Sequence, residues 1–479
     1  MIRWGIIGAG KIAHRFAKSL AYEEDSVLYA ISGRSQEKME AFQKEYPCEK
    51  IYIGHENLLK DENVDAVYIA LPHAMHKEWA LQAMRAGKAV LCEKPAVMNT
   101  AEMEEIIAVS KETGVLFMEA QKSRFTPGYL KLKEMIDRGE IGEIRSISTS
   151  FCNQMPADRF GTSYHTEPGQ GGCLLDGGIY CASWLNDFLG EDLKVDHVYG
   201  NIRKGVDFYI DARLSAGNKQ GRLECAFDRK NPQSAVIEGE KGTVAAEHLH
   251  RCDAFVVSRN GKEEQFEVPY DHDDFYSQIH HFVTLMKEGK TESDIMPLKD
   301  SLACARIMDQ IREYFTVYTI DDLRVLEKQE EMLRYESFTD NDAMELGHKI
   351  WSLLPEYDNG ISIRIIRERD EAVMFSWLSD VKAEKNYMYG EMKRQASLKS
   401  GHSSCWTWVA KNLSDEHAPE YADIEMMSGG AFPVRLKDGT LTATLCVSGL
   451  HEGKDHEIMI RALAEILHQE VPVLHKVTA

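Results

Sequence analysis

The chain has 479 residues, of which 43% are hydrophobic and 28% are charged, and its formal net charge is -21. A chain of this length exceeds what one hydrophobic core usually serves, so we expect two or three domains. The acidic excess argues against nucleic acid as a partner, because binding to phosphate backbones needs clustered lysine and arginine, and no apolar segment has the length of a membrane span.

Cysteine usage and the N-terminus indicate the compartment. The ten cysteines are scattered and form no C-x-x-C pair, which is typical of free thiols in the cytosol. The N-terminus enters an apolar strand at once, without the basic region and small-residue cleavage site of a secretory signal. We therefore expect a cytoplasmic protein.

The first twenty residues have the pattern of a dinucleotide-binding unit. Residues 2–7 predict a short buried strand, residues 8–13 (GAGKIA) a glycine turn, and residues 11–20 a helix with one apolar face. This order is the context that a dinucleotide fingerprint requires. Gly8 permits the tight turn, and Gly10 lets the backbone approach a pyrophosphate at the helix N-terminus. The cofactor contacts expected here are Gly8, Gly10, Lys11 and Ile12.

The second predicted strand, residues 27–31, ends at the position that usually distinguishes NAD from NADP. NAD sites carry an Asp or Glu there, about 20 residues beyond the glycines, which binds the ribose 2′-hydroxyl. This chain has Ser32, Arg34 and Ser35 instead. Because a guanidinium and hydroxyls suit a 2′-phosphate, we expect NADP(H) in preference to NAD(H). The alternative interpretation of Arg34 is an ordinary surface arginine.

Two more buried strands end at the same edge of the predicted sheet. Residues 66–71 run into the segment PHAMH (72–76), and residues 89–92 run into Glu93-Lys94-Pro95. The carboxyl ends of parallel strands line the ligand crevice in such folds. The further cofactor contacts expected are therefore Leu71, Pro72, His73, His76, Glu93 and Lys94. The two histidines have no other ligands nearby at a useful spacing, so no metal is expected.

Asp176 and Tyr180 stand four residues apart, which places both side chains on one face of a helix. A tyrosine phenol has an ordinary pKa near 10, too high for efficient acid–base catalysis at neutral pH. A neighbouring ammonium lowers that pKa, so Lys94 could tune Tyr180 while Asp176 orients a substrate hydroxyl. Taken singly, the three could instead be a solvated lysine, an N-cap aspartate and a half-buried tyrosine.

Together these motifs resemble the glucose–fructose oxidoreductase/inositol dehydrogenase (Gfo/Idh/MocA) family over roughly the first two thirds of the chain. The matching segments are Gly8-x-Gly10-x-x-Ala13, Glu93-Lys94-Pro95, Met118-Glu119-Ala120, Arg124-Phe125-x-Pro127, residues 139–144, Asp176-x-Gly178-x-Tyr180 and residues 296–302. The resemblance implies a Rossmann domain followed by a second α/β domain with a large, mostly antiparallel sheet. It also implies that Lys94, Asp176 and Tyr180 surround the reacting carbinol, with Tyr180 as the acid/base.

The residue at position 180 places the resemblance in one branch of that family. Many members have histidine there, whereas tyrosine is typical of dimeric dihydrodiol dehydrogenases, NADP-linked xylose dehydrogenases and glucose–fructose oxidoreductase. That branch tends to use NADP(H). Lys122 falls near a site that the branch commonly fills with an aromatic residue or methionine, so the resemblance implies an unusual substrate pocket.

The middle of the chain predicts the large sheet independently. Strand-like segments separated by turn residues are residues 145–151, 206–214, 221–227, 234–238 and 243–247. Residues 277–287 and 298–314 predict amphipathic helices, and we expect the second to pack back on the sheet. Because a large open sheet face needs covering, we also expect a homo-oligomer.

The last third predicts a separate unit of domain size after a charged connector. Its expected elements are helices at residues 341–354, 384–399 and 455–468, a hairpin of residues 361–369 and 372–378, a strand at residues 405–409, and a second hairpin with a type I′ turn at Asp438-Gly439.

This region resembles the haem-degrading or HbpS/GlcG-like family, whose fold is α+β and whose members commonly oligomerise. The matching segments are Gly401-His402-Ser403-Ser404, Gly429-Gly430-x-Phe432-Pro433 and Val447-Ser448-Gly449-Leu450. Haem binding in the wider family invites a ligand role for His402, but we expect that histidine to serve hydrogen bonding, and haem is disfavoured. A nucleophile among the neighbouring serines has less support, because no carboxylate partner can be assigned.

The expected architecture is α/β, with a Rossmann fold, a second α/β domain and a C-terminal α+β domain. The expected boundaries are 1–120 for the NADP-binding domain, 121–320 for the substrate and oligomerisation domain, 321–331 for a linker, and 332–479 for the HbpS-like domain. We expect an NADP(H)-dependent oxidoreductase acting on a small sugar, cyclic polyol or vicinal diol. Two alternatives stay open: a redox-neutral sugar-modifying enzyme with tightly bound cofactor, and a nucleotide-dependent sensor or binding protein.

Overall fold

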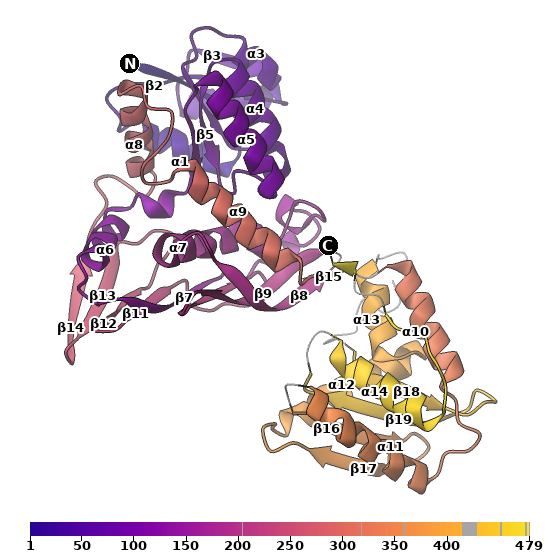
Figure 1. Cartoon of the computed structure of the whole chain (residues 1–479). Coiled ribbons are helices and arrows are strands. Elements are labelled where there is room, and N and C mark those ends of the chain that lie inside the picture. Colours follow the sequence, from indigo (N-terminus) through magenta and orange to yellow (C-terminus); the bar gives the residue numbers. More distant parts are fainter. Residues whose placement is uncertain are drawn as a thin grey trace. The chain divides into compact units, whose positions relative to one another are not determined.

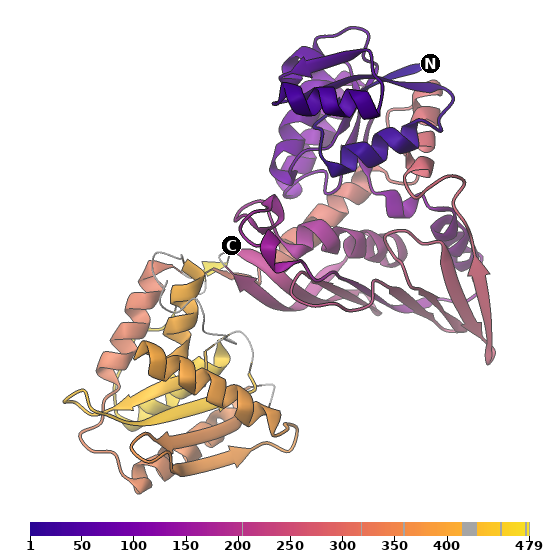
Figure 2. The same ribbon diagram turned by 180° about the vertical axis from the view of Figure 1, so that it is seen from behind.

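The computed structural model describes residues 1–479 except 204, 318, 358–359, 414–428, 451–452, 475–476 and 479. The chain forms two compact units (Figure 1; Figure 2). Unit 1 comprises Met1–Ile202 and Val206–Tyr314, and unit 2 comprises Arg203–Gly205 and Phe315–Ala479. Each unit has hydrophobic cores of its own.

The first half of unit 1 is a six-stranded parallel sheet with the strand order β3-β2-β1-β4-β5-β6. Its strands are β1 (Ile2–Ile7), β2 (Ser26–Gly33), β3 (Lys50–Ile53), β4 (Ala66–Ile69), β5 (Ala89–Glu93) and β6 (Phe117–Ala120). The order reverses between β1 and β4, which is the switch point where ligands bind in doubly wound folds. The predicted Rossmann fold is confirmed.

Helices cover both faces of this sheet, which explains why its central strands are apolar on both sides. The helices in this half are α1 (Lys11–Leu20), α2 (Gln36–Glu45), α3 (His55–Leu59), α4 (His76–Arg85) and α5 (Thr100–Thr113). One hydrophobic cluster joins the sheet to Phe16 of α1 and to Phe282, which comes from the second half of the unit. The opposite cluster contains Trp79 of α4 and Ile106 of α5.

The second half of unit 1 is built on an eight-stranded sheet with the order β14-β13-β12-β11-β7-β10-β9-β8. Its strands are β7 (Ile144–Cys152), β8 (Lys194–Arg203), β9 (Val206–Ala216), β10 (Lys219–Ala226), β11 (Ala235–Gly239), β12 (Gly242–Ala246), β13 (Ala254–Arg259) and β14 (Lys262–Glu267). Among the described pairs, β7 and β10 run parallel and the others antiparallel. The large, mostly antiparallel sheet is therefore confirmed.

The helices of this half are α6 (Pro127–Asp137), α7 (Ile179–Leu189), α8 (Tyr276–Lys287) and α9 (Leu298–Arg312). Helix α7 contacts β7 and β10 and is buried at nearly every position. Helix α9 packs on α7 and α5 (Figure 1). Its Gln310 accepts from the Val195 N–H of the edge strand β8 at 3.0 Å. The expected contact with the large sheet is therefore made at this edge strand, while α7 covers β7 and β10.

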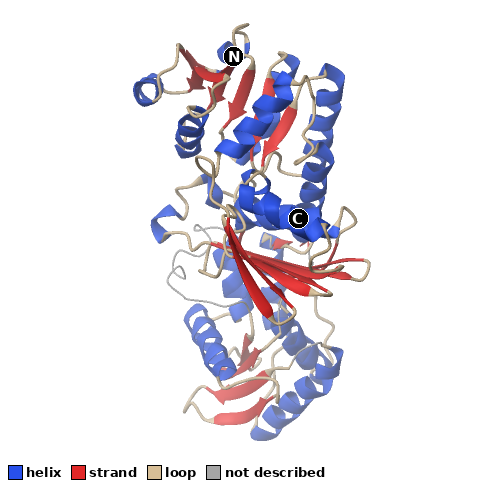
Figure 3. Ribbon diagram, turned by 90° about the vertical axis from the view of Figure 1, so that its left-hand side faces the viewer, coloured by secondary structure: helices blue, strands red, loops and turns tan. Residues whose placement is uncertain are grey.

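Unit 2 has a four-stranded antiparallel sheet with the order β17-β16-β19-β18. Strands are red and helices blue in Figure 3. Its strands are β16 (Ser362–Arg367), β17 (Val373–Leu378), β18 (Ala431–Arg435) and β19 (Leu441–Ser448), and a short pair joins β15 (Thr316–Val317) to β20 (Val477–Thr478). The helices are α10 (Ile320–Met332), α11 (Asp340–Leu353), α12 (Lys385–Ser400), α13 (Ser404–Leu413) and α14 (Lys454–Ile466). The predicted α+β class is confirmed.

Three expectations for the last third differ from the structure. The helix-prone connector expected at residues 321–331 is most of helix α10, but it is part of unit 2, where its Leu326 shares a hydrophobic cluster with Val409 of α13. The strand expected at residues 405–409 is part of helix α13, because Cys405 and Val409 lie one helical turn apart on the buried side. The turn at Asp438-Gly439 is not type I′, since that type needs positive φ at both positions and only the glycine, at φ +91°, has it.

Among the described residues, no helix combines the length and the apolar character needed to cross a membrane.

Candidate functional site

A cavity of about 720 Å³ opens in unit 1 at the carboxyl edge of the Rossmann sheet. Its lining residues are Gly8, Ala9, Gly10, Lys11, Ile12, Arg15, Gly33, Arg34, Ser35, Lys38, Met39, His55, Ala70, Leu71, Pro72, His73, His76, Glu93, Lys94, Tyr164, His165 and Asp176. The last three come from the second half of the unit, so both halves contribute to one site. Most residues expected to contact a cofactor therefore line a single cavity.

The glycine turn has the shape that a dinucleotide pyrophosphate needs. Gly8 has φ +97°, and a Cβ there would lie 2.6 Å from the Ala70 carbonyl oxygen. Gly10 precedes α1 without a side-chain cap, so the first N–H groups of the helix face the cavity. A Cβ at Gly10 would meet no protein atom nearer than 3.9 Å, so it would fill space in the cavity that a phosphate could occupy. The residues present fit the dinucleotide.

Three residues at the end of β2 surround the place where a ribose 2′-substituent would lie. Arg34, Ser35 and Lys38 all line the cavity, and the Ser35 hydroxyl also caps α2 by accepting from the Lys38 N–H at 3.4 Å. Ser32 does not line the cavity: it is buried, and its hydroxyl bonds His55 Nδ1 at 2.8 Å. The sequence analysis did not predict that Lys38 lines the cavity, although its position only four residues after Arg34 could have indicated this.

At the other end of the cavity, Lys94 and Asp176 form a half-buried ion pair. Lys94 follows β5, its bond to Pro95 is cis, and its ammonium donates to Asp176 Oδ1 at 2.8 Å and to the Asp176 carbonyl oxygen at 2.6 Å. Burial works against the charge of Asp176, but Lys94 and then His165 hold its pKa well below the usual range. Burial likewise opposes the charge of Lys94, yet Asp176 and Tyr180 raise its pKa above the ordinary value.

Tyr180 of α7 lies beside this pair. The ammonium of Lys94 is 4.9 Å from the centroid of the phenol ring, and the side chain of Phe151 packs on the ring from another direction. The tyrosine is 6% exposed and does not itself line the cavity. Burial raises its pKa above the ordinary value, and the lowering effect of Lys94 is smaller. The structure thus brings all three residues together, but with the phenol in its protonated form.

His76 and Glu93 stabilise the segments that line the cavity next to this group. His76 is buried, and its ring nitrogens lie 2.8 Å from the Pro95 and Leu71 carbonyl oxygens, so it ties the loop after β4 to the loop after β5. Glu93 accepts from the Tyr68 hydroxyl and from the Lys94 N–H, and burial raises its pKa. Both line the cavity, yet their polar atoms are engaged by the protein.

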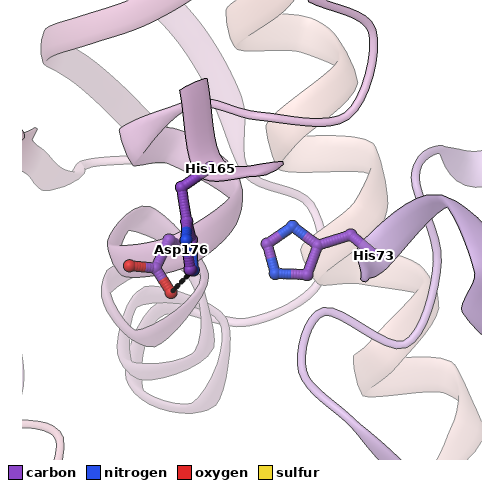
Figure 4. A group of neighbouring side chains, drawn as sticks. All are labelled: His73, His165 and Asp176. Carbon is purple, nitrogen blue, oxygen red and sulfur yellow. Dashed lines mark ion pairs between the residues drawn. The ribbon is translucent and has the colours of Figure 1, made fainter. Parts of the chain in front are cut away.

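The loop that joins β7 to α7 adds Tyr164 and His165, which sequence reasoning missed. His165 Nε2 lies 3.8 Å from Asp176 Oδ1, and His73 points toward both from the loop after β4 (Figure 4). His73, His165 and Asp176 each place one potential ligand atom within 4.8 Å of the others. Residues 153–170 were expected to form a pocket loop, but the loop has no hydrophobic periodicity, so its individual contact residues could not be picked out from the sequence.

Lys122, which the sequence marked as unusual, is buried against Asp274 and Phe275. The Asp274 carboxylate also pairs with Arg15, a residue of the cavity lining. Burial lowers the pKa of Lys122 to about 8, against the opposing effect of Asp274. The lysine therefore belongs to a charged cluster next to the cavity and does not line it.

In unit 2, the motif residues around His402 make a hydrogen-bonded framework. His402 Nδ1 pairs with Glu330 Oε2 at 2.8 Å, and its ring stacks on Trp406 at 4.2 Å. Glu330 raises the pKa of His402, partly offset by burial. The Ser404 hydroxyl accepts from the Gly430 N–H at 3.0 Å, which fixes the approach to β18. These contacts accord with the hydrogen-bonding role expected for this histidine.

Comparison with known proteins matches the two units to different families. Residues 2–121 match the family described as "Oxidoreductase family, NAD-binding Rossmann fold", residues 129–245 match the "GFO/IDH/MocA C-terminal domain", and residues 338–464 match "Haem degrading protein HbpS-like". The mouse trans-1,2-dihydrobenzene-1,2-diol dehydrogenase is 33% identical over 337 residues, which cover 67% of this chain and 99% of the mouse protein. This chain belongs to the Gfo/Idh/MocA family.

Other Gfo/Idh/MocA proteins support the assignment. The scyllo-inositol 2-dehydrogenase (NADP(+)) of Bacillus subtilis is 34% identical over 67% of this chain and 99% of its own length. A 3-ketoreductase from Actinomadura kijaniata, solved with NADP and TDP-benzene, is 29% identical with a TM-score of 0.60, over 65% of this chain and 97% of its own. The chain is thus an NAD(P)-dependent oxidoreductase with an HbpS-like C-terminal region.

Proposed function

We propose that this protein transfers hydride between NADP(H) and a secondary carbinol of a sugar, cyclic polyol or vicinal diol. The observation that carries the proposal is the convergence of Lys94, Asp176 and Tyr180 at one end of a cavity whose other end has a phosphate-binding glycine turn. The relatives named for a dihydrodiol, an inositol and a keto sugar derivative support this substrate class.

Tyr180, Lys94 and Asp176 have different roles in this reaction, which follow from their charge and protonation state. In the oxidation direction, Tyr180 accepts the proton of the substrate hydroxyl as the hydride leaves the same carbon, and in reduction it returns that proton. The Lys94 ammonium, 4.9 Å from the phenol ring, stabilises the phenolate while it exists. Asp176 keeps Lys94 in position and offers a carboxylate to a substrate hydroxyl. When bound, the nicotinamide supplies or accepts the hydride at its C4.

We base the proposed preference for NADP(H) on the residues that follow β2. Arg34 and Lys38 bring two cationic side chains to the cavity there, and the expected Asp or Glu of an NAD site is missing from the sequence. A doubly charged 2′-phosphate would be balanced by this pair, whereas the neutral 2′-hydroxyl of NAD would gain little from it.

Replacement of the phenol tests the proposal directly. Tyr180→Phe should lower turnover by at least about a hundredfold, as loss of a general acid/base usually does, while NADPH affinity is retained. Steady-state rates with a panel of sugars, inositols and diols, together with NADPH fluorescence titration, measure both quantities. Tyr22→Phe, at an exposed surface tyrosine, is the matched control. Turnover of Tyr180→Phe at the wild-type rate would remove Tyr180 from the mechanism.

A further inference from the structure

The loop that carries His165 holds this side chain in one defined orientation. His165 lies in a short 3-10 turn, Tyr164–Thr166, and its backbone N–H donates to the Ser163 hydroxyl at 3.4 Å. The same hydroxyl lies 2.9 Å from His165 Nδ1. The hydroxyl can accept from the backbone N–H and donate its own proton to Nδ1, and we assign the imidazole proton to Nε2 on this basis. The loop therefore presents an N–H donor to the cavity.

That donor faces the Asp176 carboxylate, whose Oδ1 already accepts from the Lys94 ammonium at 2.8 Å, and the buried imidazole of His73. His165 Nε2 and Asp176 Oδ1 are 3.8 Å apart, too far for a hydrogen bond to each other. His73 is 3% exposed, and among the described residues its Nδ1 has no hydrogen-bond partner. All three groups point toward a common space at the cavity wall (Figure 4). A buried polar atom without a partner in the protein is a feature that a ligand can satisfy.

We propose that His73, His165 and Asp176 form a hydroxyl socket, which binds the second hydroxyl of a vicinal diol next to the reacting carbinol. An oxygen in the 3.8 Å gap can accept from His165 Nε2 and donate to Asp176 at the same time. The carbinol oxygen is then left to Tyr180 and Lys94. This inference rests on the proposed function and assigns recognition of the hydroxyl next to the reacting carbinol to His73 and His165, together with Asp176.

A hydroxyl suits the socket better than a metal ion, although two imidazoles and a carboxylate can bind one. The Lys94 ammonium lies 2.8 Å from the same Asp176 oxygen that a cation would need. A divalent ion in the socket would therefore sit close to the positive charge of Lys94, which costs Coulomb energy. A neutral hydroxyl carries no such penalty.

The experiment compares two probes that differ by one hydroxyl. Initial rates with NADP⁺ are measured for trans-cyclohexane-1,2-diol and for cyclohexanol. The wild type should favour the diol by at least about a hundredfold in kcat/KM, because a site built to bind a hydroxyl rejects the analogue that lacks it. His165→Ala should lower kcat/KM for the diol by about 10- to 100-fold, mainly through KM, and lower that for cyclohexanol much less. His165→Gln, whose amide can donate, should recover part of the diol activity.

Thr162→Val is the control on the same loop, since that hydroxyl donates to the Asp158 carbonyl oxygen and the residue is exposed. Equal losses for both alcohols in His165→Ala would show a merely structural role and overturn the socket alone. Calorimetry with ZnCl2 is the second arm: tight binding that disappears in His165→Ala and in His73→Ala would assign the cluster to a metal and overturn the proposal. A wild type that oxidises neither alcohol nor any member of the wider panel would overturn the proposed function as well.

Discussion

Tyr180 illustrates how burial and a neighbouring charge compete at the scale of one residue. The sequence suggested that Lys94 lowers the phenol pKa, and the ammonium does act in that direction from 4.9 Å. Burial is the larger effect, so the pKa lies above the ordinary value of 10.0. The resting side chain is therefore a phenol, ready to donate its proton in the reduction direction, and oxidation has to draw on the small phenolate fraction.

This protonation state predicts opposite pH behaviour for the two directions. Below the pKa of a base, its reactive form increases about tenfold per pH unit, so kcat/KM for diol oxidation should rise at that rate between pH 7 and 9. Reduction uses the phenol, which predominates throughout, and should stay nearly flat. Initial rates at three pH values in both directions measure this. An oxidation rate that levels off below pH 8 would contradict the raised pKa of Tyr180.

Arg34 is the residue on which the cofactor preference rests. Arg34→Ala should weaken NADPH binding by about 10-fold or more and NADH binding by less than about twofold, because only NADPH carries the 2′-phosphate. Fluorescence titration with each cofactor gives the two affinities. Glu37→Ala, on the neighbouring turn of α2 and outside the cavity lining, is the control. Equal weakening of both cofactors would reverse the assignment.

At the scale of elements, the two glycines of the β1–α1 turn meet different requirements. Gly8 meets one set by the backbone, and Gly10 meets one set by the ligand. Gly8 needs its left-handed φ, and a Cβ there would lie only 2.6 Å from a backbone oxygen of the loop after β4. Gly10 has φ -80°, which any residue can adopt, and its surroundings leave room for a methyl group. The two glycines of one motif are thus required for different physical reasons: Gly8 permits the backbone turn, and Gly10 leaves space for the ligand.

Two alanine substitutions should separate these roles. Gly8→Ala should lower the unfolding free energy by about 1–3 kcal/mol through backbone strain, and lower NADPH affinity with it. Gly10→Ala should leave the melting temperature within about 2 °C of the wild type and still weaken NADPH binding by about 10-fold or more. Thermal unfolding and fluorescence titration give the two readouts. Full NADPH affinity in Gly10→Ala would show that the pyrophosphate does not approach this turn.

At the scale of the whole molecule, the chain is two units with separate cores. The clusters of unit 1 join the Rossmann sheet to its helices, and the main cluster of unit 2 lies between its sheet, α11 and α14. The dihydrodiol and inositol dehydrogenase relatives match 67% of this chain over 99% of their own length. The cavity is lined by unit 1 alone.

A chain ending at Tyr314 should therefore retain the oxidoreductase site. We expect it to bind NADPH and to turn over the same substrates with kcat/KM within about threefold of the full chain, since compact units with their own cores fold independently. Gel filtration and steady-state rates compare the two chains. A soluble truncated protein that binds NADPH but has lost turnover would show that the HbpS-like region takes part in the reaction.

By itself, the sequence determined most of the helices and strands and most of the residues at the two ends of the cavity. Strong local signals explain this success: the glycines after β1, the buried parallel strands, and the spacing of Asp176 and Tyr180 are all encoded within short segments. The helix at residues 404–413 was mistaken for a strand, because a short run of cysteine, tryptophan and valine has no clear period until its packing partner on α10 is known.

Only the tertiary structure decided which of these residues meet. It bonded the Ser32 hydroxyl to His55, added Lys38 and His165 to the cavity, and set Lys94 beside Asp176 and Tyr180. It also set the direction of the phenol pKa, because burial depends on every element that covers the ring and cannot be read from the residue and its sequence neighbours. The sequence shows which chemical groups are present and in what order. The distances between these groups and the polarity of their surroundings depend on how the chain packs.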